Sequence, residues 1–270
     1  MSNFWKRAIT GTLFVVLMVS AILAGLEFMV TLFGLAALIG AGELTKIMGR
    51  PFGSTVSGSW AVLSALLVYL LIAGISLEWF DINSLVCIIP VLVVQVSIEL
   101  FNPKHDFTKM AAMAFALVLI ASAFGLLSSV SVVLGYYEFM IPLGIFIFIW
   151  VNDTGAYLMG KNFGKTKLIP NVSPGKTVEG FVGGVASTLT AAFLIADLNP
   201  DVLESKDWMI FALIVAVFSN FGDFSESMLK RQYGVKDSGK VLPGHGGVLD
   251  RFDGILLAAP MLFFYLLLRY

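Results

Sequence analysis

The feature that most constrains this chain is a series of long apolar runs separated by short polar turns. Nine runs approach the roughly 20 residues that an α-helix needs to cross a bilayer. They cover about 8–26, 28–44, 59–76, 83–101, 109–128, 138–157, 177–197, 207–229 and 252–268. Only 13% of the residues are charged, about half the usual share in soluble domains. The pattern predicts an all-α, polytopic membrane helical bundle with about nine transmembrane helices.

The positions of the basic residues indicate how these helices are oriented. With a cytoplasmic N-terminus and nine spans, all 17 lysines and arginines except Lys206 and Arg269 fall on the cytoplasmic side. Cytoplasmic loops are enriched in Lys and Arg, so this asymmetry supports both the count and the orientation. The first run is interpreted as a retained helix, because no small-x-small cleavage site is clear after Gly25. We therefore expect a multi-pass protein of the cell inner (plasma) membrane with its chemistry on the cytoplasmic side.

Charged residues gather around the end of the eighth run and the start of the ninth. Four of them are the carboxylates Asp223, Glu226, Asp250 and Asp253. Ionisable groups within membrane segments are costly and mark function by default. Mg²⁺ is usually held by one or two carboxylates together with substrate phosphates. The cluster predicts a metal site, and the alternative is a set of salt bridges at helix ends with Lys230, Arg231 and Arg251.

Two features of the segment between these runs favour phosphate binding. The loop 230–240 is rich in lysine and arginine, although the positive-inside bias alone would also place such residues there. Pro243-Gly-His-Gly-Gly247 is glycine-rich, and glycines let backbone N–H groups approach an anion. The alternative for this second segment is a tight turn without a ligand. His245 could donate to a phosphate, act as an acid or base, or lie on the surface, and its role stays open.

A second group of polar residues lies near the ends of the sixth and seventh runs. Gly175-Lys176-Thr177 is not a P-loop, because Pro170 stands where that motif requires glycine. The segment instead predicts a helix N-terminus, capped by Ser173 or Thr177, with Lys176 as a phosphate contact. Asp153 lies at the cytoplasmic end of the sixth run. The alternative there is an ordinary helix C-terminus followed by glycine.

The segment 227–253 resembles the signature of the phosphatidate cytidylyltransferase (CDP-diacylglycerol synthase) family. The resemblance is carried by Ser227-Met-Leu-Lys-Arg231, Lys236-Asp-Ser-Gly239 and Leu242-Pro-Gly-His-Gly-Gly-Val-Leu-Asp-Arg-Phe-Asp253. Four further segments are similar to the same family: Asp153-Thr-Gly-Ala-Tyr157, Gly160-Lys-Asn-Phe-Gly-Lys165, Ser173-Pro-Gly-Lys-Thr177 and Glu179-Gly-Phe-Val-Gly-Gly184. Together they cover most of 150–255, whereas the first 140 residues resemble the family only in hydropathy.

The resemblance implies a nucleotidyltransferase of phospholipid biosynthesis that uses Mg²⁺, with K⁺ as a second cation. It would transfer a cytidylyl group from CTP to phosphatidate, giving CDP-diacylglycerol and pyrophosphate. Its implied metal ligands are Asp223 and Asp250, supported by Asp253 and Glu226. The implied catalytic residues are Asp223, Asp250, Lys230 and Arg231. The implied substrate- and phosphate-binding residues are Asp153, Ser173, Lys176, Ser227, Lys236, Asp237, Lys240, His245, Gly246, Gly247 and Arg251.

The chain is expected to divide into two parts. Residues 1–140 would form membrane helices that act as a scaffold and offer a homodimer interface, and residues 141–270 would carry the site. The expected partners are CTP, phosphatidate and the bilayer, with no nucleic acid. An ion or proton transporter is the main rival, but the outer halves of the segments are almost purely apolar. The Asp-Gly-x-x-Ala-Arg pattern of CDP-alcohol phosphotransferases and the acidic clusters of polyprenyl transferases are absent.

Overall fold

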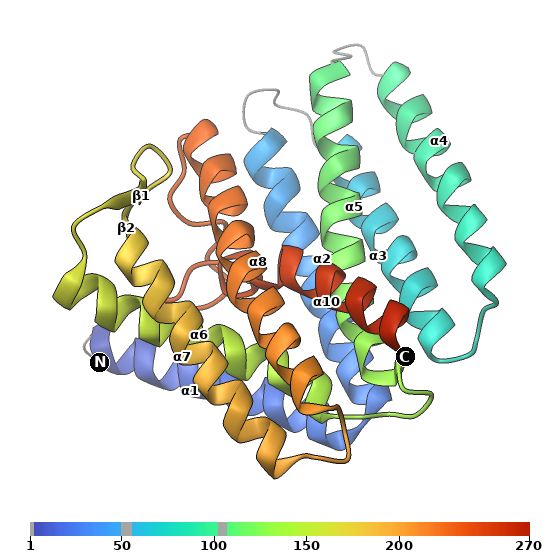
Figure 1. The fold of residues 1–270 in the computed structure, drawn as a ribbon. Coiled ribbons are helices and arrows are strands. Elements are labelled where there is room, and N and C mark those ends of the chain that lie inside the picture. Colours follow the sequence, from blue (N-terminus) through green and yellow to red (C-terminus); the bar gives the residue numbers. More distant parts are fainter. Residues whose placement is uncertain (1–2, 50–55, 102–106) are drawn as a thin grey trace.

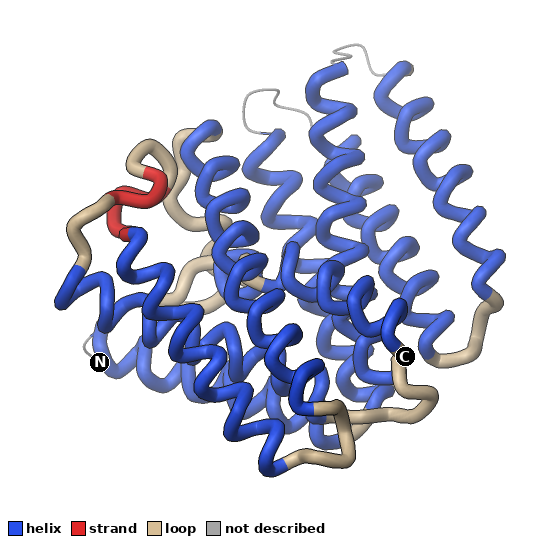
Figure 2. The backbone as a smooth tube through the Cα atoms, viewed as in Figure 1, coloured by secondary structure: helices blue, strands red, loops and turns tan. Residues whose placement is uncertain are grey.

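The structure, a computed structural model, describes residues 3–49, 56–101 and 107–270 and is mostly helical (Figures 1 and 2). Its α-helices are α1 (Asn3–Ala24), α2 (Leu26–Gly49), α3 (Val56–Ser76), α4 (Ile88–Leu100), α5 (Phe107–Ser129), α6 (Met140–Phe163), α7 (Val178–Leu198), α8 (Ser205–Gln232), α9 (Leu249–Phe252) and α10 (Ile255–Arg269). Short 3-10 helices cover Ile82–Cys87 and Val130–Val132. Each predicted apolar run is helical in the structure, although the fourth is divided between a 3-10 helix and α4.

Five of the described helical stretches are long and apolar enough to cross a membrane. They are Leu26–Gly49, Ser59–Ser76, Met140–Phe163, Val178–Leu198 and Ser205–Gln232. Shorter apolar helices lie at Ala8–Ala24, Ile82–Ile98, Val118–Val132 and Ile255–Arg269. The length and composition of these helices support a membrane protein, because a helical span satisfies its backbone hydrogen bonds internally.

The prediction of a purely helical chain was wrong at one place. An antiparallel hairpin, β1 (Lys167–Ile169) and β2 (Ser173–Thr177), connects α6 to α7. Pro170 and Pro174 disfavour a helix here, because each lacks an N–H group and restricts the residue before it. Thr177 caps α7, since its hydroxyl accepts a hydrogen bond from the Gly180 N–H at 3.1 Å. Ser173 lies in the hairpin strand instead.

The ninth predicted run is also divided, into α9 and α10, by a break at Asp253 and Gly254. The Asp253 carboxylate accepts a hydrogen bond from the Gly254 N–H at 2.7 Å, a local bond that competes with helix continuation. α8 passes close to this break: a Cβ on Gly222 would overlap the Asp253 carbonyl oxygen. Gly222 thus lets the polar part of α8 lie directly against the start of α10.

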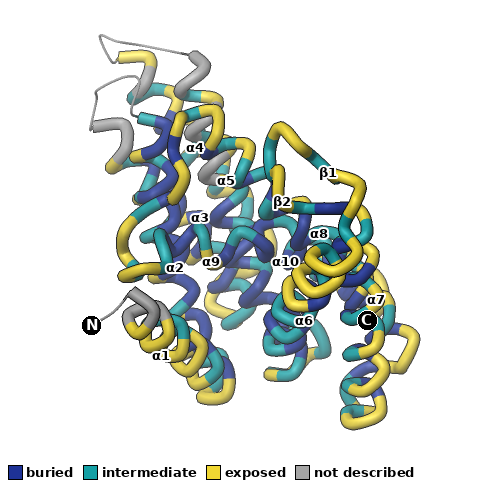
Figure 3. Tube along the Cα trace, turned by 90° about the vertical axis from the view of Figure 1, so that its left-hand side faces the viewer, coloured by how far each residue is buried: buried dark blue, intermediate teal, exposed yellow. Residues whose placement is uncertain are grey.

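The helices pack in two groups joined by α10 (Figure 1). In one group, α6 packs on α7 and α7 packs on α8. In the other, α2, α3 and α5 pack against one another, and α10 packs against both α5 and α8. Figure 3 shows that the buried residues lie between the helices and that the outward faces are exposed. Outward apolar side chains are expected for a bundle that faces lipid.

An aromatic cluster fixes α9 at the centre of the molecule. The Phe252 ring lies 5.2 Å from Phe124 of α5, 6.0 Å from Phe33 of α2 and 6.2 Å from Phe146 of α6, measured between centroids. Its contacts with all three rings are edge-to-face, a favoured geometry for aromatic pairs. Because Phe252 is 3% exposed, the short helix that carries the neighbouring acidic residues is held by the core.

A separate polar cluster joins the start of α8 to the end of α10. Asp207 is fully buried. Its carboxylate accepts hydrogen bonds from the Tyr265 hydroxyl at 2.5 Å, the Tyr270 hydroxyl at 2.7 Å and Arg269 Nε at 3.3 Å. These contacts hold the last residues of the chain against α8, at the end of α8 remote from Asp223.

Replacing Asp207 with alanine is therefore expected to destabilise the fold by about 1–3 kcal/mol, because three side chains lose their hydrogen bonds to a charged acceptor. The comparison is Asp201→Ala, the same change at an exposed position in the preceding loop. Thermal unfolding in detergent, followed by tryptophan fluorescence, measures both. Equal midpoints for the two variants would contradict a stabilising role for the Asp207 cluster.

Candidate functional site

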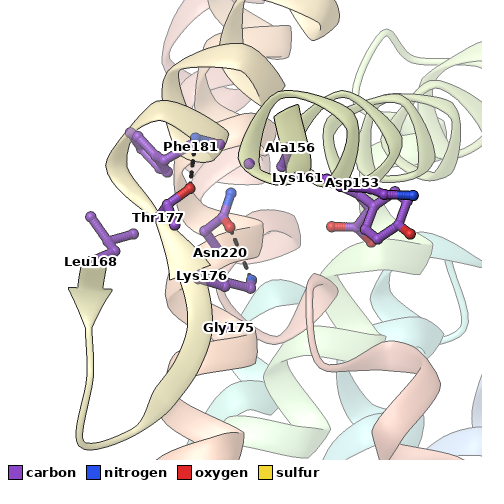
Figure 4. Close-up of a pocket in the computed structure, with 12 residues that line it drawn as sticks. Asp153, Ala156, Lys161, Leu168, Gly175, Lys176, Thr177, Phe181 and Asn220 are labelled. Atoms are coloured by element: carbon purple, nitrogen blue, oxygen red, sulfur yellow. Dashed lines mark hydrogen bonds between the residues drawn. The ribbon is translucent and has the colours of Figure 1, made fainter. Parts of the chain in front are cut away.

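The polar stripe of α8 faces the hairpin. Asp223 forms an ion pair with Lys176 of β2, with 2.5 Å between Oδ2 and Nζ. The same ammonium donates to Asn220 Oδ1 at 3.1 Å (Figure 4) and lies 4.7 Å from the centroid of the Phe224 ring. Ser227 donates to Asp223 Oδ1 at 3.3 Å. One turn of α8 and one strand of the hairpin thus bring three predicted site residues together.

A second ion-paired group lies one turn further along α8. Lys230 is buried, and its ammonium donates to Glu226 at 2.8 Å and to Asp250 Oδ1 at 2.7 Å. Asp250 Oδ2 accepts hydrogen bonds from the N–H groups of Ser238 at 2.9 Å and Gly247 at 2.7 Å. Burial raises the pKa of Asp250. Lys230 and these N–H groups lower the pKa by more than burial raises it, so it lies below its ordinary value.

Glu43 of α2 completes this group from the other half of the chain. Its carboxylate is 4% exposed and accepts hydrogen bonds from the Ser238 hydroxyl at 3.0 Å, the Val248 N–H at 3.0 Å and the Leu249 N–H at 2.9 Å. The last two N–H groups lie at the start of α9, where a helix leaves donors unpaired. Glu43 therefore fixes the loop between α8 and α9 to α2.

Sequence reasoning did not identify Glu43 as a site residue. Glu43 lies near the end of the second predicted run, 28–44. The signal that could have identified it is the presence of a carboxylate within a helix of membrane-spanning length, a placement that by default indicates function. Two glycines explain why the loop fits so closely: a Cβ on Gly239 or Gly247 would overlap the Glu43 carboxylate.

The glycine-rich segment forms a narrow turn. The Leu242 N–H donates to the Gly246 carbonyl at 3.0 Å, and Gly244 and Gly246 have φ of 79° and 86°. These left-handed conformations favour glycine. Arg251 Nε donates to the His245 carbonyl at 3.1 Å and so attaches the turn to α9. A cavity of about 670 Å³, which we call the basic cavity, lies over this turn and is lined by Lys236, Asp237, Lys240, His245, Gly246 and Arg251 among others.

Two further cavities belong to this region. One of about 320 Å³ lies between α6, α7 and the hairpin, with Asp153, Lys161 and Lys176 on its lining (Figure 4). The other, of about 400 Å³, shares Asp153 with that cavity and His245 and Arg251 with the basic cavity. Asp153 is thus common to two cavities and lies within electrostatic reach of Lys176, Asp223 and Arg251. We call the three cavities, which are related through these shared lining residues, the polar tract.

The donor set fits a divalent cation that shares its ligands with a substrate. Among the described residues, no three acidic, histidine or cysteine side chains form a ready-made metal site. Mg²⁺ needs only one or two carboxylates when phosphates and waters supply the rest. Lysine ammonium groups already lie beside both predicted ligands, Asp223 and Asp250. Asp253 is within electrostatic reach of Asp223 and Glu226, so these three carboxyl groups lie near one another.

Two predicted residues stand apart from this arrangement. Ser173 pairs with Ile169 in the hairpin, and it lines none of the three cavities. Arg231 is exposed on the last turn of α8, next to the buried Lys230 but on another face of the helix. The other predicted residues line the cavities or belong to the two ion-paired groups.

The apolar helices define an integral-membrane protein. Among these helices lies a charged site made of paired acids and lysines and of close-packed glycines. The chain belongs to the cytidylyltransferase family, whose model matches residues 5–269. A relative from Bacillus subtilis (strain 168) named phosphatidate cytidylyltransferase is 48% identical over 122 residues, 45% of each chain.

Other relatives carry the same name. The one from Staphylococcus aureus (strain COL) is 48% identical over 122 residues, 43% of this chain and 45% of its own. The one from Staphylococcus haemolyticus (strain JCSC1435) is 43% identical over 122 residues, with the same coverage. The matched part of the chain thus spans about half the length of these curated relatives.

Replacing Glu43 with glutamine is expected to loosen the loop between α8 and α9. The amide turns one acceptor into a donor that faces other donors, at a cost of about 1–3 kcal/mol. The variant should unfold at lower temperature, and limited proteolysis should cut residues 233–248 faster than in the unmodified protein. Glu27→Gln, at the exposed opposite end of α2, is the matched control. Unchanged cleavage in Glu43→Gln would refute the attachment.

Proposed function

We propose that this protein transfers a cytidylyl group from CTP to phosphatidate and releases CDP-diacylglycerol and pyrophosphate. Membership of the cytidylyltransferase family supports the nucleotide, and the printed names of the relatives support the lipid. The observation that carries the proposal is the polar tract itself. It places lysines, an arginine and carboxylates beside apolar helices, where a water-soluble triphosphate and a membrane lipid can meet.

The reaction brings two anions together, so its barrier is largely electrostatic. A phosphate oxygen of phosphatidate forms a bond to the α-phosphorus of CTP. The bond from that phosphorus to the β-phosphate oxygen breaks, and pyrophosphate leaves. A phosphate monoester is already ionised near neutral pH, since its second pKa is about 6. No strong general base is needed, and His245 is not assigned that role.

Charged residues of the tract then have distinct tasks. Lys236 and Lys240, which line the basic cavity, bind the phosphates that become pyrophosphate, and Arg251, which lines this cavity and the one beside α1, binds the phosphate of the lipid. Lys176 neutralises charge beside Asp223, and Lys230 holds Asp250 in place. The close-packed Gly246 and Gly247 let the backbone approach an anion. Ser227 orients Asp223, and Asp153 lies between the cavities.

Asp223 and Asp250 are the proposed ligands of Mg²⁺, with Asp253 and Glu226 in support and K⁺ as a second cation. When bound, the metal supplies positive charge to the phosphates that react. The chain's own contribution is to hold two carboxylates at fixed places. Asp250 is held by Lys230 and two backbone N–H groups, and Asp223 is held by Lys176 and Ser227.

The remaining proposals concern topology and assembly. All nine apolar segments cross the inner (plasma) membrane, the N-terminus is cytoplasmic, and the polar tract faces the cytoplasm, as the distribution of lysine and arginine favours. Residues 1–140 act mainly as a scaffold, apart from Glu43, and residues 141–270 carry the chemistry. A homodimer through the scaffold helices is the corresponding proposal for assembly, and the mass of the protein in detergent tests it.

The decisive experiment supplies purified protein with labelled phosphatidate, Mg²⁺ and one of CTP, ATP, GTP or UTP. Product is expected with CTP alone, because the family transfers cytidylyl groups. Thin-layer separation of the labelled lipid measures the product. Equal use of ATP would refute the assignment to CTP, and no product with any nucleotide would refute the function.

Replacing Asp223 with asparagine is expected to lower turnover at least about 100-fold, as losing one essential electrostatic contact to the transition state does. The asparagine keeps the size of the side chain, so thermal unfolding should change little. Asp197→Asn serves as control, because Asp197 is exposed near the end of α7 that is remote from the hairpin. Turnover of Asp223→Asn near that of the control would exclude Asp223 as a metal ligand.

A further inference from the structure

One cavity of the tract has an apolar wall made by α1 and α6. Of its lining, Gly11, Phe14, Val15 and Met18 belong to α1, and Phe146, Ile149 and Trp150 belong to α6. Its other end carries Asp153, His245, Asp250, Arg251 and Asp253. The cavity, which we call the α1–α6 cavity, therefore runs from an apolar wall to the charged site within about 400 Å³.

Helix α1 is placed so that it can act as this wall. Its second half is anchored in the core: Met18 and Ile22 are buried, and the Tyr137 hydroxyl donates to the Ile22 carbonyl at 2.5 Å. Phe14 meets the Phe252 ring at 5.4 Å, which directs this face of α1 toward the site. Other side chains of α1 are exposed (Figure 3), among them Val16, which is 54% exposed. α1 thus forms one wall of the cavity.

Helix α1 approaches the turn 242–246 at a glycine. A Cβ on Gly11 would lie 3.2 Å from His245 Nε2. A larger residue at this position would therefore push against the imidazole ring. The absence of a side chain keeps the end of the cavity open between α1 and the turn 242–246.

We propose that the α1–α6 cavity seats the lipid substrate, with the first part of its acyl chains along α1 and α6 and its phosphate directed toward Arg251 and His245. This inference rests on the proposed function and assigns a location to its lipid. An apolar wall that ends in a guanidinium group suits an amphiphile with an anionic head. A nucleotide, which is polar over most of its surface, would leave the α1 wall without a partner.

The carboxylates at the same end, Asp153, Asp250 and Asp253, would repel a bare phosphate. Under the proposed function a divalent cation would be held by Asp250 together with Asp223, and its charge would offset this repulsion. Seating of the lipid should then depend on Mg²⁺. This dependence distinguishes the α1–α6 cavity from nonspecific partition of a lipid onto the apolar surface, which needs no metal.

Another apolar cavity competes for the same role. It encloses about 180 Å³ between α2, α5, α8 and α10, and its lining includes Phe115, Leu119 and Glu226. That lining carries no lysine or arginine, and its carboxylate, Glu226, is already paired with Lys230, so no cation of the lining would balance the charge of a phosphate there. The charge at the polar end therefore favours the α1–α6 cavity, and the other one becomes an outcome of the test.

Two neighbouring valines of α1 provide a matched test. Val15 lines the cavity and is 36% exposed, whereas Val16 is 54% exposed and does not line it. Val15→Trp fills the seat and should raise the KM for phosphatidate at least about fivefold, since overfilling a packed site typically costs 1 kcal/mol or more. The KM for CTP should stay the same, and Val16→Trp should leave both values unchanged.

A binding measurement complements the kinetics and needs no turnover. Phosphatidate with a photoreactive group near the start of an acyl chain is irradiated with the unmodified protein and Mg²⁺, without CTP, and the labelled peptides are identified. Label is expected on α1 within 11–18, and it should fall at least about fivefold in Val15→Trp or when Mg²⁺ is removed. If Val15→Trp does not fold, Val15→Phe replaces it in both experiments.

The outcomes separate this inference from the proposed function. Label on Phe115 or Leu119 of α5, or equal KM values for Val15→Trp and Val16→Trp, would overturn the seat while CDP-diacylglycerol is still made. Label on α1 that is indifferent to Mg²⁺ would overturn it as well. Failure of the unmodified protein to make any product from CTP and phosphatidate would instead reject the function on which the seat rests.

Discussion

The site depends on the buried Glu43 carboxylate, which joins two parts of the chain that are about 200 residues apart. It accepts bonds from Ser238, Val248 and Leu249, so the loop between α8 and α9 cannot move away from α2. Phe252 adds an apolar anchor three residues later. With both attachments, Asp250 is held at a fixed distance from α8, and the basic turn lies over it.

The second constraint is the pairing of charge among apolar helices. A buried ion left without its partner costs about 3–5 kcal/mol, and three acids of the site are paired with lysines. Asp223 is paired with Lys176 from the hairpin, and Asp250 and Glu226 share Lys230. Such pairs need not stabilise the fold strongly, but they specify the position of α8 relative to the hairpin and to α9. The same geometry concentrates acid and base where two anionic substrates would meet.

Much of the site could be predicted because its signals are local. Asp223 and Ser227 are four residues apart on one helix, and their hydrogen bond follows from that spacing. The glycines at 244, 246 and 247 predicted a turn with unusual φ. Gly244 and Gly246 have left-handed φ, and Gly247 follows directly. Glu43 was missed because its partners are distant in sequence. An isolated acid in an apolar helix does not indicate which residues it will bind. Ser173 was misplaced because its segment could cap a helix or form a strand.

The sequence by itself determined the positions of the apolar helices, the membrane character of the chain and the residue types of the site. These follow from side-chain period and transfer free energy, which are local properties. Only the tertiary structure decided that Lys176 reaches Asp223, that Lys230 bridges Glu226 and Asp250, and that α1 supplies a wall to the site. Those outcomes depend on how helices pack, and packing is set by shape and charge complementarity between segments that no spacing along the chain encodes.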